Sequence, residues 1–206
     1  MGEPEVRAQL IEAAYAVVER TGALDLTMRD LLCEAGLSNQ AFYRHFRSKD
    51  DLFIAMLDDG RRRMAGHLRR RMSGAATPAA AVRSWVEGVL GQAGDPLAAA
   101  RTRPFLTHVD RLAARFPEEQ RASERTMLEP LVAALRGADD GGPRSGAEQR
   151  GDIERDARTV YLLTVAALHQ HLRDGTRPGR ADTDHLTAFV LNGLRGTGDR
   201  SPDTSR

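Results

Sequence analysis

The chain has 206 residues, with 30 basic and 29 acidic side chains and a formal net charge of +1. This length allows one large domain or two small ones, and the balanced charge means that any basic patch must be local. The single cysteine excludes an internal disulfide framework, and no apolar run approaches the ~20 residues that cross a bilayer. We therefore expect a cytoplasmic protein without membrane contact.

Helical patterns cover nearly the whole chain, because alternating β-branched runs are missing and alanine is frequent. The first predicted helix, over residues 5–21, carries Leu10, Ala14 and Val17 on one face and ends before Gly22. Each of the next three helices begins at a hydroxyl side chain that can cap it, and Gly36 supplies the turn between the first two. Their predicted ranges are 27–35, 38–46 and 48–72.

Five more helices are predicted in the second part of the chain, over residues 78–92, 96–115, 117–136, 152–173 and 182–195. Residues 137–151 contain five glycines and a proline among charges, which predicts a mobile loop. The last residues, 196–206, are expected to fray.

Two short helices around a glycine turn form a unit whose second helix lies in the DNA major groove. In the second helix, Phe42 and Phe46 are four residues apart and share the inward face. The preceding helix adds Leu31, Leu32 and Cys33 to this core, so Cys33 is expected to be a buried small hydrophobe. The outward face then presents polar side chains, namely Asn39, Gln40, Tyr43 and Arg44.

These polar residue types suit contacts with a duplex. Asn39 and Gln40 can each bond adenine N6 and N7, although a solvated surface role remains an alternative for both. Tyr43 can bond a phosphate or pack on a thymine methyl group, and His45 can reach a phosphate. Arg29 can reach a guanine edge or the backbone.

Lys49 is the only lysine of the chain and lies in the first turn of its predicted helix. A cation there is unfavourable for the helix dipole, unless a phosphate neutralises it. The helix starts at Thr27 and Ser48 offer free N–H groups that also suit phosphates. Lys49 is thus a candidate phosphate contact, with a solvated lysine as the alternative.

Residues 10–53 resemble the DNA-binding domain of the TetR family of bacterial transcription regulators. The resemblance is carried by LTMRDLLCEAGLS at 26–38 and AFYRHFRSK at 41–49, with Phe42 where leucine is commoner. It implies base contacts from Arg29 and the start of the second helix, and phosphate contacts from Thr27, Tyr43, His45 and Lys49. The complete candidate set for DNA comprises Thr27, Arg29, Ser38, Asn39, Gln40, Tyr43, Arg44, His45 and Lys49.

The resemblance implies an all-α architecture in two parts. Residues 1–50 would form the three-helix DNA-binding domain, and residues 51–206 would form a larger helical domain for ligand binding and dimerisation. A three-helix unit with a purely structural role is the alternative for the N-terminal part.

Two arginine clusters, 61–63 and 69–71, look like a nucleic-acid patch. Arg61 lies 12 residues beyond Lys49, which is about 18 Å along a helix at ~1.5 Å per residue. We therefore expect most of these arginines to be solvated or paired with acids such as Asp58 and Asp59.

The predicted helix 152–173 has apolar side chains on two faces and so needs two partners. Together with the last helix it could meet its symmetry mate in a four-helix interface, unless both pack only within the monomer. The candidate interface residues are Ile153, Val160, Thr164, Leu168, Leu172, Leu186, Phe189 and Val190.

The middle helices offer a mixed apolar and polar set that could line a site for a small, mostly apolar effector. Its members are Trp85, Val89, Phe105, His108, Val109, Leu112, Met127, Leu131, Tyr161 and His169. Such stripes are also typical of an ordinary core. His169 and His171 point about 200° apart on a helix, so no metal site is expected. The sequence contains no cofactor or catalytic motif, so we do not expect an enzyme.

These patterns favour a homodimeric repressor that binds a palindromic double-stranded operator and is released by a small molecule. A regulator of the same fold without an inducer, or one controlled by a protein, is the first alternative. An enzyme in the C-terminal domain is the second.

Overall fold

The computed structural model describes residues 2–137 and 146–198, and within them it contains ten α-helices, two 3-10 helices and no strand. This confirms the all-α fold. The α-helices are α1 (Glu3–Thr21), α2 (Met28–Ala35), α3 (Asn39–His45), α4 (Lys49–Met72), α5 (Pro78–Leu90), α6 (Pro96–Thr102), α7 (Val109–Arg115), α8 (Pro117–Arg136), α9 (Gly146–Asp174) and α10 (Arg180–Gly198). The 3-10 helices are η1 (Gly91–Ala93) and η2 (Arg103–Phe105).

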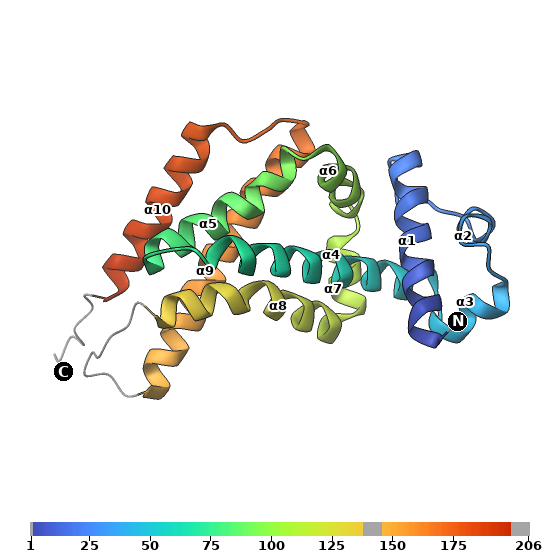
Figure 1. Cartoon of the computed structure of the whole chain (residues 1–206), viewed down its shortest axis with the longest axis horizontal. Helices are drawn as coiled ribbons and strands as arrows, with labels where there is room; N and C mark the ends of the chain where they lie inside the picture. The colour runs from blue at the N-terminus through green and yellow to red at the C-terminus, as the bar shows by residue number, and fades with distance from the viewer. Residues whose placement is uncertain (1, 138–145, 199–206) are drawn as a thin grey trace.

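The helices divide the molecule into an end and a body. α1, α2 and α3 form one end, and α4 runs from this end into the body, where α8 packs along it (Figure 1). α5, α9 and α10 complete the body, and α6 and α7 lie between the two parts (Figure 1). α4 is therefore the element that connects the three-helix end with the rest.

The predicted helix starts at Thr27, Ser38 and Ser48 are confirmed by capping bonds. In each case the side-chain oxygen accepts the backbone N–H three residues further on, at 3.1 to 3.2 Å. α2 ends at Gly36, whose φ of 62° lies in the left-handed region that favours glycine. This turn sets α3 across α2.

A first hydrophobic cluster holds α1, α2, α3 and the start of α4 together. Phe42 and Phe46 are buried in it, as predicted, together with Leu10, Ala14, Val17 and Leu31 of the preceding helices. The prediction for Cys33 is wrong, because its side chain is exposed. α2 buries Leu31 and Ala35, and Cys33 lies two residues from each, on the opposite face of the helix.

A second hydrophobic cluster fills the body and includes Trp85 of α5, Leu131 of α8 and Leu168 of α9. Both clusters draw on α4: the first includes its residues up to Met56, and the second begins at Ala65. Phe105 and Leu112, from the segment between α6 and α8, join the first cluster. A domain boundary at residue 50 remains a prediction, and residues 52–56 of α4, which follow this position, still belong to the first cluster.

Three predicted segments differ from the structure. The helix expected over 96–115 is broken into α6, η2 and α7, because Pro104 lacks the N–H that a continuous helix needs. The loop expected over 137–151 is too long, since α9 begins at Gly146. α10 extends to Gly198, past the predicted end. Residues 138–145 and 199–206, where a mobile loop and fraying were predicted, lie outside the described part.

Five of the eight residues predicted for a dimer interface are buried inside the protomer, so their assignment to a surface is wrong. They are Val160, Thr164, Leu168, Leu172 and Val190. These side chains face the second cluster or bond within their own helix, as the Thr164 hydroxyl does with the Val160 carbonyl at 2.8 Å. Ile153 and Leu186 are half-buried. Phe189, also in the predicted set, is 63% exposed, and α9 exposes two large apolar side chains that were not predicted, Leu162 (52%) and Leu163 (38%).

Candidate nucleic-acid interface and adjoining cavity

The outward face of α3 is polar, as predicted. Asn39, Gln40, Tyr43 and Arg44 are all exposed, and Tyr43 is 60% exposed. The ring of Tyr43 meets the buried ring of Phe42 edge-on, with 5.2 Å between the centroids. Its hydroxyl is thereby held out from the core and is available to a ligand outside the protein.

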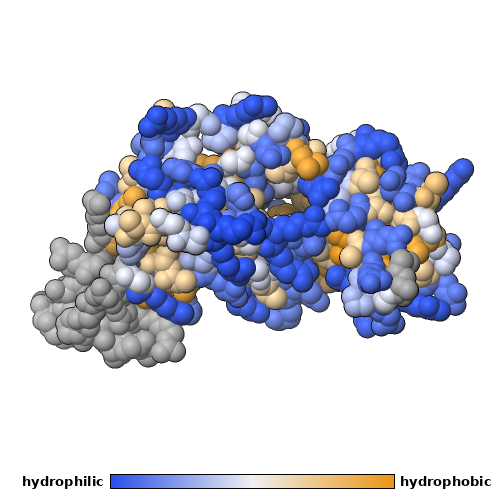
Figure 2. Space-filling view, in the orientation of Figure 1, coloured by the Kyte–Doolittle hydropathy of each residue, from blue (hydrophilic) through white to orange (hydrophobic). Residues whose placement is uncertain are grey.

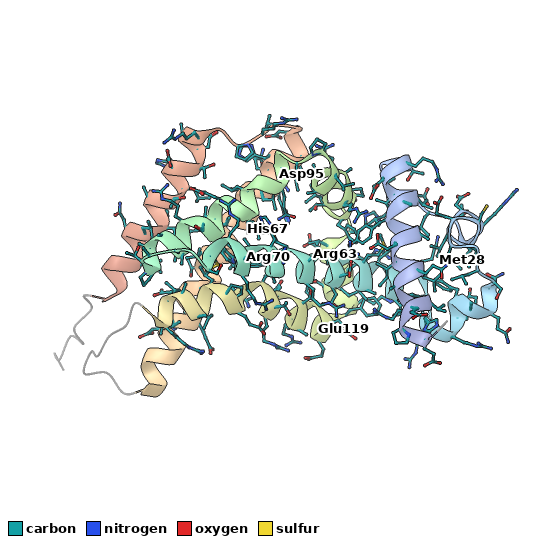
Figure 3. The ribbon with its side chains drawn as sticks, in the orientation of Figure 1. Met28, Arg63, His67, Arg70, Asp95 and Glu119 are labelled. Atoms are coloured by element: carbon teal, nitrogen blue, oxygen red, sulfur yellow. The ribbon has the colours of Figure 1, made fainter. Side chains whose placement is uncertain are left out.

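The other predicted DNA contacts surround this face. Thr27, Arg29, Ser38 and Lys49 are exposed, whereas His45 is half-buried. All nine candidate residues therefore lie on α2, α3 or the caps and first turns beside them. The structure brings them together at one end of the molecule, the end that carries Met28 in Figure 3.

Lys49 has a bond that its sequence position did not predict. Its Nζ donates to the backbone carbonyl of Leu26 at 3.2 Å. The ammonium group, which belongs to the first turn of α4, thus lies beside the residue that precedes the Thr27 cap of α2. Two helix N-termini and one cation are close together, an arrangement that favours an anion such as a phosphate.

Four of the six arginines in the two clusters pair with acids, as expected for most of them. Arg62 binds Asp58 at 2.5 Å, and Arg63 binds Asp59 at 2.8 Å and also Glu12 of α1. In the second cluster, Arg69 and Arg71 bind Glu129 and Glu87 at 2.8 and 3.1 Å. These pairs link α4 to α1, α8 and α5, so the arginines serve mainly to join helices.

A cavity of about 320 Å³ lies where α4, α6, η2, α8 and α9 meet, next to α1. Figure 2 shows a hollow in the middle of the molecule, between the three-helix end and the body. Its walls comprise Tyr15, Met56, Leu57, Gly60, Arg61, Arg63, Met64, His67, Val89, Gln92, Ala98, Arg101, Thr102, Phe105, Leu106, Val109, Met127, Tyr161, Val165, Leu168 and His169. Arg63 and His67, two of the residues from α4, are marked in Figure 3.

Six of the ten residues predicted for a ligand site line this cavity, namely Val89, Phe105, Val109, Met127, Tyr161 and His169. The other four do not. Trp85 and Leu131 are buried in the second cluster, where the Trp85 indole N–H donates to the Met127 carbonyl at 3.3 Å. Leu112 is buried in the first cluster. His108 is the residue before α7, and its Nδ1 bonds Thr107 at 2.8 Å.

Sequence reasoning missed the part of the lining that comes from α1, α4 and α6. Tyr15 looks like one more core residue of the first helix, and Arg61 and Arg63 look like surface cations. The residues of α4 that line the cavity include 57, 60, 61, 64 and 67, which follow a helical spacing. The spacing itself can be seen in the sequence. Because polar and apolar side chains are mixed along it, these positions do not form the apolar face by which a buried helix surface is recognised.

Tyr15 connects the cavity to the three-helix end. Its hydroxyl donates to the Met56 carbonyl at 2.5 Å, and its ring lies against the guanidinium groups of Arg101 and Arg63, at 4.7 and 5.9 Å. Burial, and then the charge of Asp59, raise the pKa of this phenol, so it is neutral. Gly60 leaves room for it, since a Cβ there would lie 3.1 Å from the hydroxyl.

Two further lining groups have shifted pKa values. Burial raises the pKa of Tyr161, and the charge of Arg61 opposes this shift. Burial lowers the pKa of His169, and the charges of Arg173 and Arg61 lower it further, while Asp110 acts in the opposite direction. Both groups are therefore neutral near pH 7 and can donate or accept hydrogen bonds inside the cavity.

A glycine turn between two short helices, an exposed polar face on the second one and capped N-termini beside it together define a helix-turn-helix DNA-binding protein. Residues 10–56 match the family model described as bacterial regulatory proteins, tetR family. This match confirms the resemblance in the N-terminal sequence, and the chain carries the DNA-binding domain of the TetR family.

Solved structures share the fold of the whole chain. A TetR transcriptional regulator from Rhodococcus sp. RHA1 is 19% identical, with a TM-score of 0.62 over 99% of this chain and 100% of that one. A TetR-family regulator from Mesorhizobium loti is 16% identical, with a TM-score of 0.65 over 96% and 98%. The regulator FadR from Bacillus subtilis, in complex with stearoyl-CoA, is 16% identical, with a TM-score of 0.62 over 91% and 96%.

The family match therefore places a TetR-type DNA-binding domain in residues 10–56, and the solved structures share the fold of the whole chain. Within residues 2–137 and 146–198, no helix is long and apolar enough to cross a membrane. The same residues contain no group of three or more His, Cys, Asp or Glu that could hold a metal ion.

Proposed function

We propose that the protein is a homodimeric repressor that binds a palindromic operator and releases it when a small molecule occupies the central cavity. The observation that carries this proposal is the position of Tyr15. It belongs to α1 of the DNA-binding end, and it also lines the cavity. A ligand that displaces Tyr15 or α4 therefore acts directly on the elements that hold α2 and α3.

On the duplex, Arg29, Asn39 and Gln40 would contact base edges. Phosphates would be bound by Thr27, Tyr43, His45 and Lys49, and Ser38 and Arg44 would complete the interface. The exposed face of α3 and the grouped N-termini of α2 and α4 support this division. The first supplies directional donors and acceptors, and the second supplies positive potential.

A twofold dimer would read two half-sites. The exposed apolar side chains on α9 and α10, Leu162, Leu163 and Phe189, support a surface that a second copy covers. The half-buried Ile153 and Leu186 would lie beside them. In such a dimer a ligand need only change the separation of the two α3 helices, and it can weaken operator binding by its differential affinity and no more.

The cavity favours a small-molecule effector over a regulator without one. Its volume of about 320 Å³ falls in the range of ligand sites, and most of its lining is apolar. The related fold of FadR, with 16% identity, holds stearoyl-CoA in its solved complex. A body without a cavity would instead have favoured control by a protein partner.

Selection of duplexes from a random library, followed by fluorescence anisotropy, tests the proposal. The expected result is one enriched palindrome, bound by two chains with an affinity that falls steeply as salt rises. Titration of the Tyr15→Phe variant then tests the coupling between the cavity and the DNA-binding end. Loss of the Tyr15–Met56 bond should change how strongly a ligand weakens DNA binding more than it changes DNA affinity without ligand. Enrichment of no sequence, or of a single half-site bound by one chain, would reject the proposal.

A further inference from the structure

The ionisable lining of the cavity is basic. It contains Arg61, Arg63, Arg101, His67 and His169, and no carboxylate from the described part of the chain lines it. The remaining walls are largely apolar, with Met56, Met64, Val89, Phe105 and Met127 among them. Because charges interact strongly in such surroundings, this cavity disfavours a cation and favours an anion.

Two of the three arginines are already neutralised by carboxylates. Arg63 binds Glu12 and, at 2.8 Å, Asp59. Arg101 binds Glu19 at 2.5 Å. Both guanidinium groups also lie against the Tyr15 ring, so they stabilise the contact between α1, α4 and α6 and have little charge left for a ligand.

Arg61 differs from both. Its Nη1 donates to the side-chain carbonyl of Gln120 at 2.9 Å, which is a bond to a neutral amide. Among the residues that the structure describes, no carboxylate lies within ion-pair distance of it. A guanidinium has five N–H donors, so Arg61 retains both its charge and most of its donors for a further acceptor.

Two neutral polar groups share the cavity with Arg61. Tyr161 and His169 both line it from α9, and burial favours the neutral form of each. A phenol and a neutral imidazole can each donate a hydrogen bond. A planar carboxylate accepts such bonds on both oxygens and pairs with a guanidinium in the same plane.

We propose that the cavity takes an amphipathic carboxylate whose charged group binds Arg61 beside Tyr161 and His169, and whose apolar body fills the rest of the cavity. This assignment presupposes the proposed function, because it names the chemical class of the effector. At the ~30 Å³ that a water molecule occupies in the liquid, the cavity holds about ten non-hydrogen atoms. Octanoate has this size and is a suitable probe.

Calorimetric titration of the full chain with octanoate, 1-octanol and octylammonium tests the charge preference at constant body size. Octanoate is expected to bind at least about tenfold more tightly than 1-octanol, and octylammonium should bind most weakly. Arg61→Met should reduce the preference for octanoate over 1-octanol to less than about threefold. Arg61→Lys, which keeps the charge without the planar donors, should retain part of it.

Arg62→Met is the matched control, because Arg62 pairs with Asp58 outside the cavity and should leave the preference unchanged. Circular dichroism and thermal unfolding of each variant establish that it is folded. Equal binding of octanoate and 1-octanol, a preference that survives Arg61→Met, or no binding of any of the three probes would each overturn the assignment.

These outcomes are separate from a failure of the proposed function. Tight binding of 1-octanol with release of the selected operator would leave a ligand-controlled repressor with an uncharged effector. Failure of the unliganded chain to bind any selected duplex would remove the repressor itself, whatever the probes do.

Discussion

Arg115 Nη1 lies 2.7 Å from Asp50 Oδ2, and the same oxygen accepts a bond from Arg111 Nη1 at 2.9 Å. Asp50 is a buried residue in the first turn of α4, and both arginines belong to α7. One carboxylate thus fastens α7 to the turn that carries Lys49. The pairing holds the start of α4 against α7.

Asp50→Asn should lower the free energy of unfolding by about 1–2 kcal/mol in urea denaturation. The carboxylate loses its charge and two charged hydrogen bonds, while the half-exposed arginines regain water, which limits the loss. Glu118→Gln removes an exposed pair with Arg121 and should change stability by less than about 0.5 kcal/mol. Equal effects of the two substitutions would contradict a structural role for the Asp50 cluster.

Lys49→Ala should weaken binding to the selected operator and to unrelated duplexes by a similar factor. It should also flatten the slope of log affinity against log salt by about 0.9, the value for one lost phosphate contact. Anisotropy titrations between low and moderate salt measure both quantities. Arg62→Ala is the control, since it removes a charge at a distance from α2 and α3. An unchanged slope for Lys49→Ala would place the duplex elsewhere.

Gln40→Ala should relax sequence choice at one base pair in each half-site, with a loss of discrimination of about 1–3 kcal/mol. Gln40 is exposed on α3, so the substitution leaves the core intact. Repeating the duplex selection with the variant shows the effect directly as a degenerate position. If the enriched sequence were identical for both proteins, Gln40 would not contact a base.

Phe189→Asp should shift the protein from dimer to monomer in sedimentation velocity and leave the protomer folded. The side chain is 63% exposed in the protomer, so a charge costs little there but disrupts an apolar interface. Val190→Asp is the contrast. Val190 is buried, so a carboxylate in its place should destabilise the fold by about 3 kcal/mol or more. A Phe189→Asp variant that stays dimeric would exclude this face.

His169→Gln should make stability less dependent on pH below about 6.5. The folded-state pKa of His169 lies below its usual value of 6.5, chiefly through burial and then through Arg173 and Arg61, against Asp110. The unfolded chain therefore binds more protons in this window, and stability falls as pH drops below 6.5. Urea denaturation at pH 5 and at pH 7.5 measures the effect. Equal pH dependence in both proteins would contradict the burial of His169.

The N-terminal fold was readable from sequence because its information is local. Capping hydroxyls, Gly36 and the Phe42–Phe46 spacing each act within one or two helical turns. Only part of the cavity lining could be predicted from the sequence. Tyr161 and His169 followed from their helix, but Arg61 and Tyr15 owe their positions to contacts between helices far apart in the chain. The faces of α9 were misassigned because a helix that is apolar on two sides does not reveal which side meets its own protomer.

The sharing of α4 between two hydrophobic clusters limits how this protein can be recombined. Two bonds cross a junction between α3 and α4, namely Tyr15 to the Met56 carbonyl and Lys49 to the Leu26 carbonyl. A chimera joined there would pair each side chain with the backbone of a different protein. A graft that continues to Met56 carries both bonds intact. We therefore expect operator preference to transfer with roughly the first quarter of the chain, with the junction inside α4.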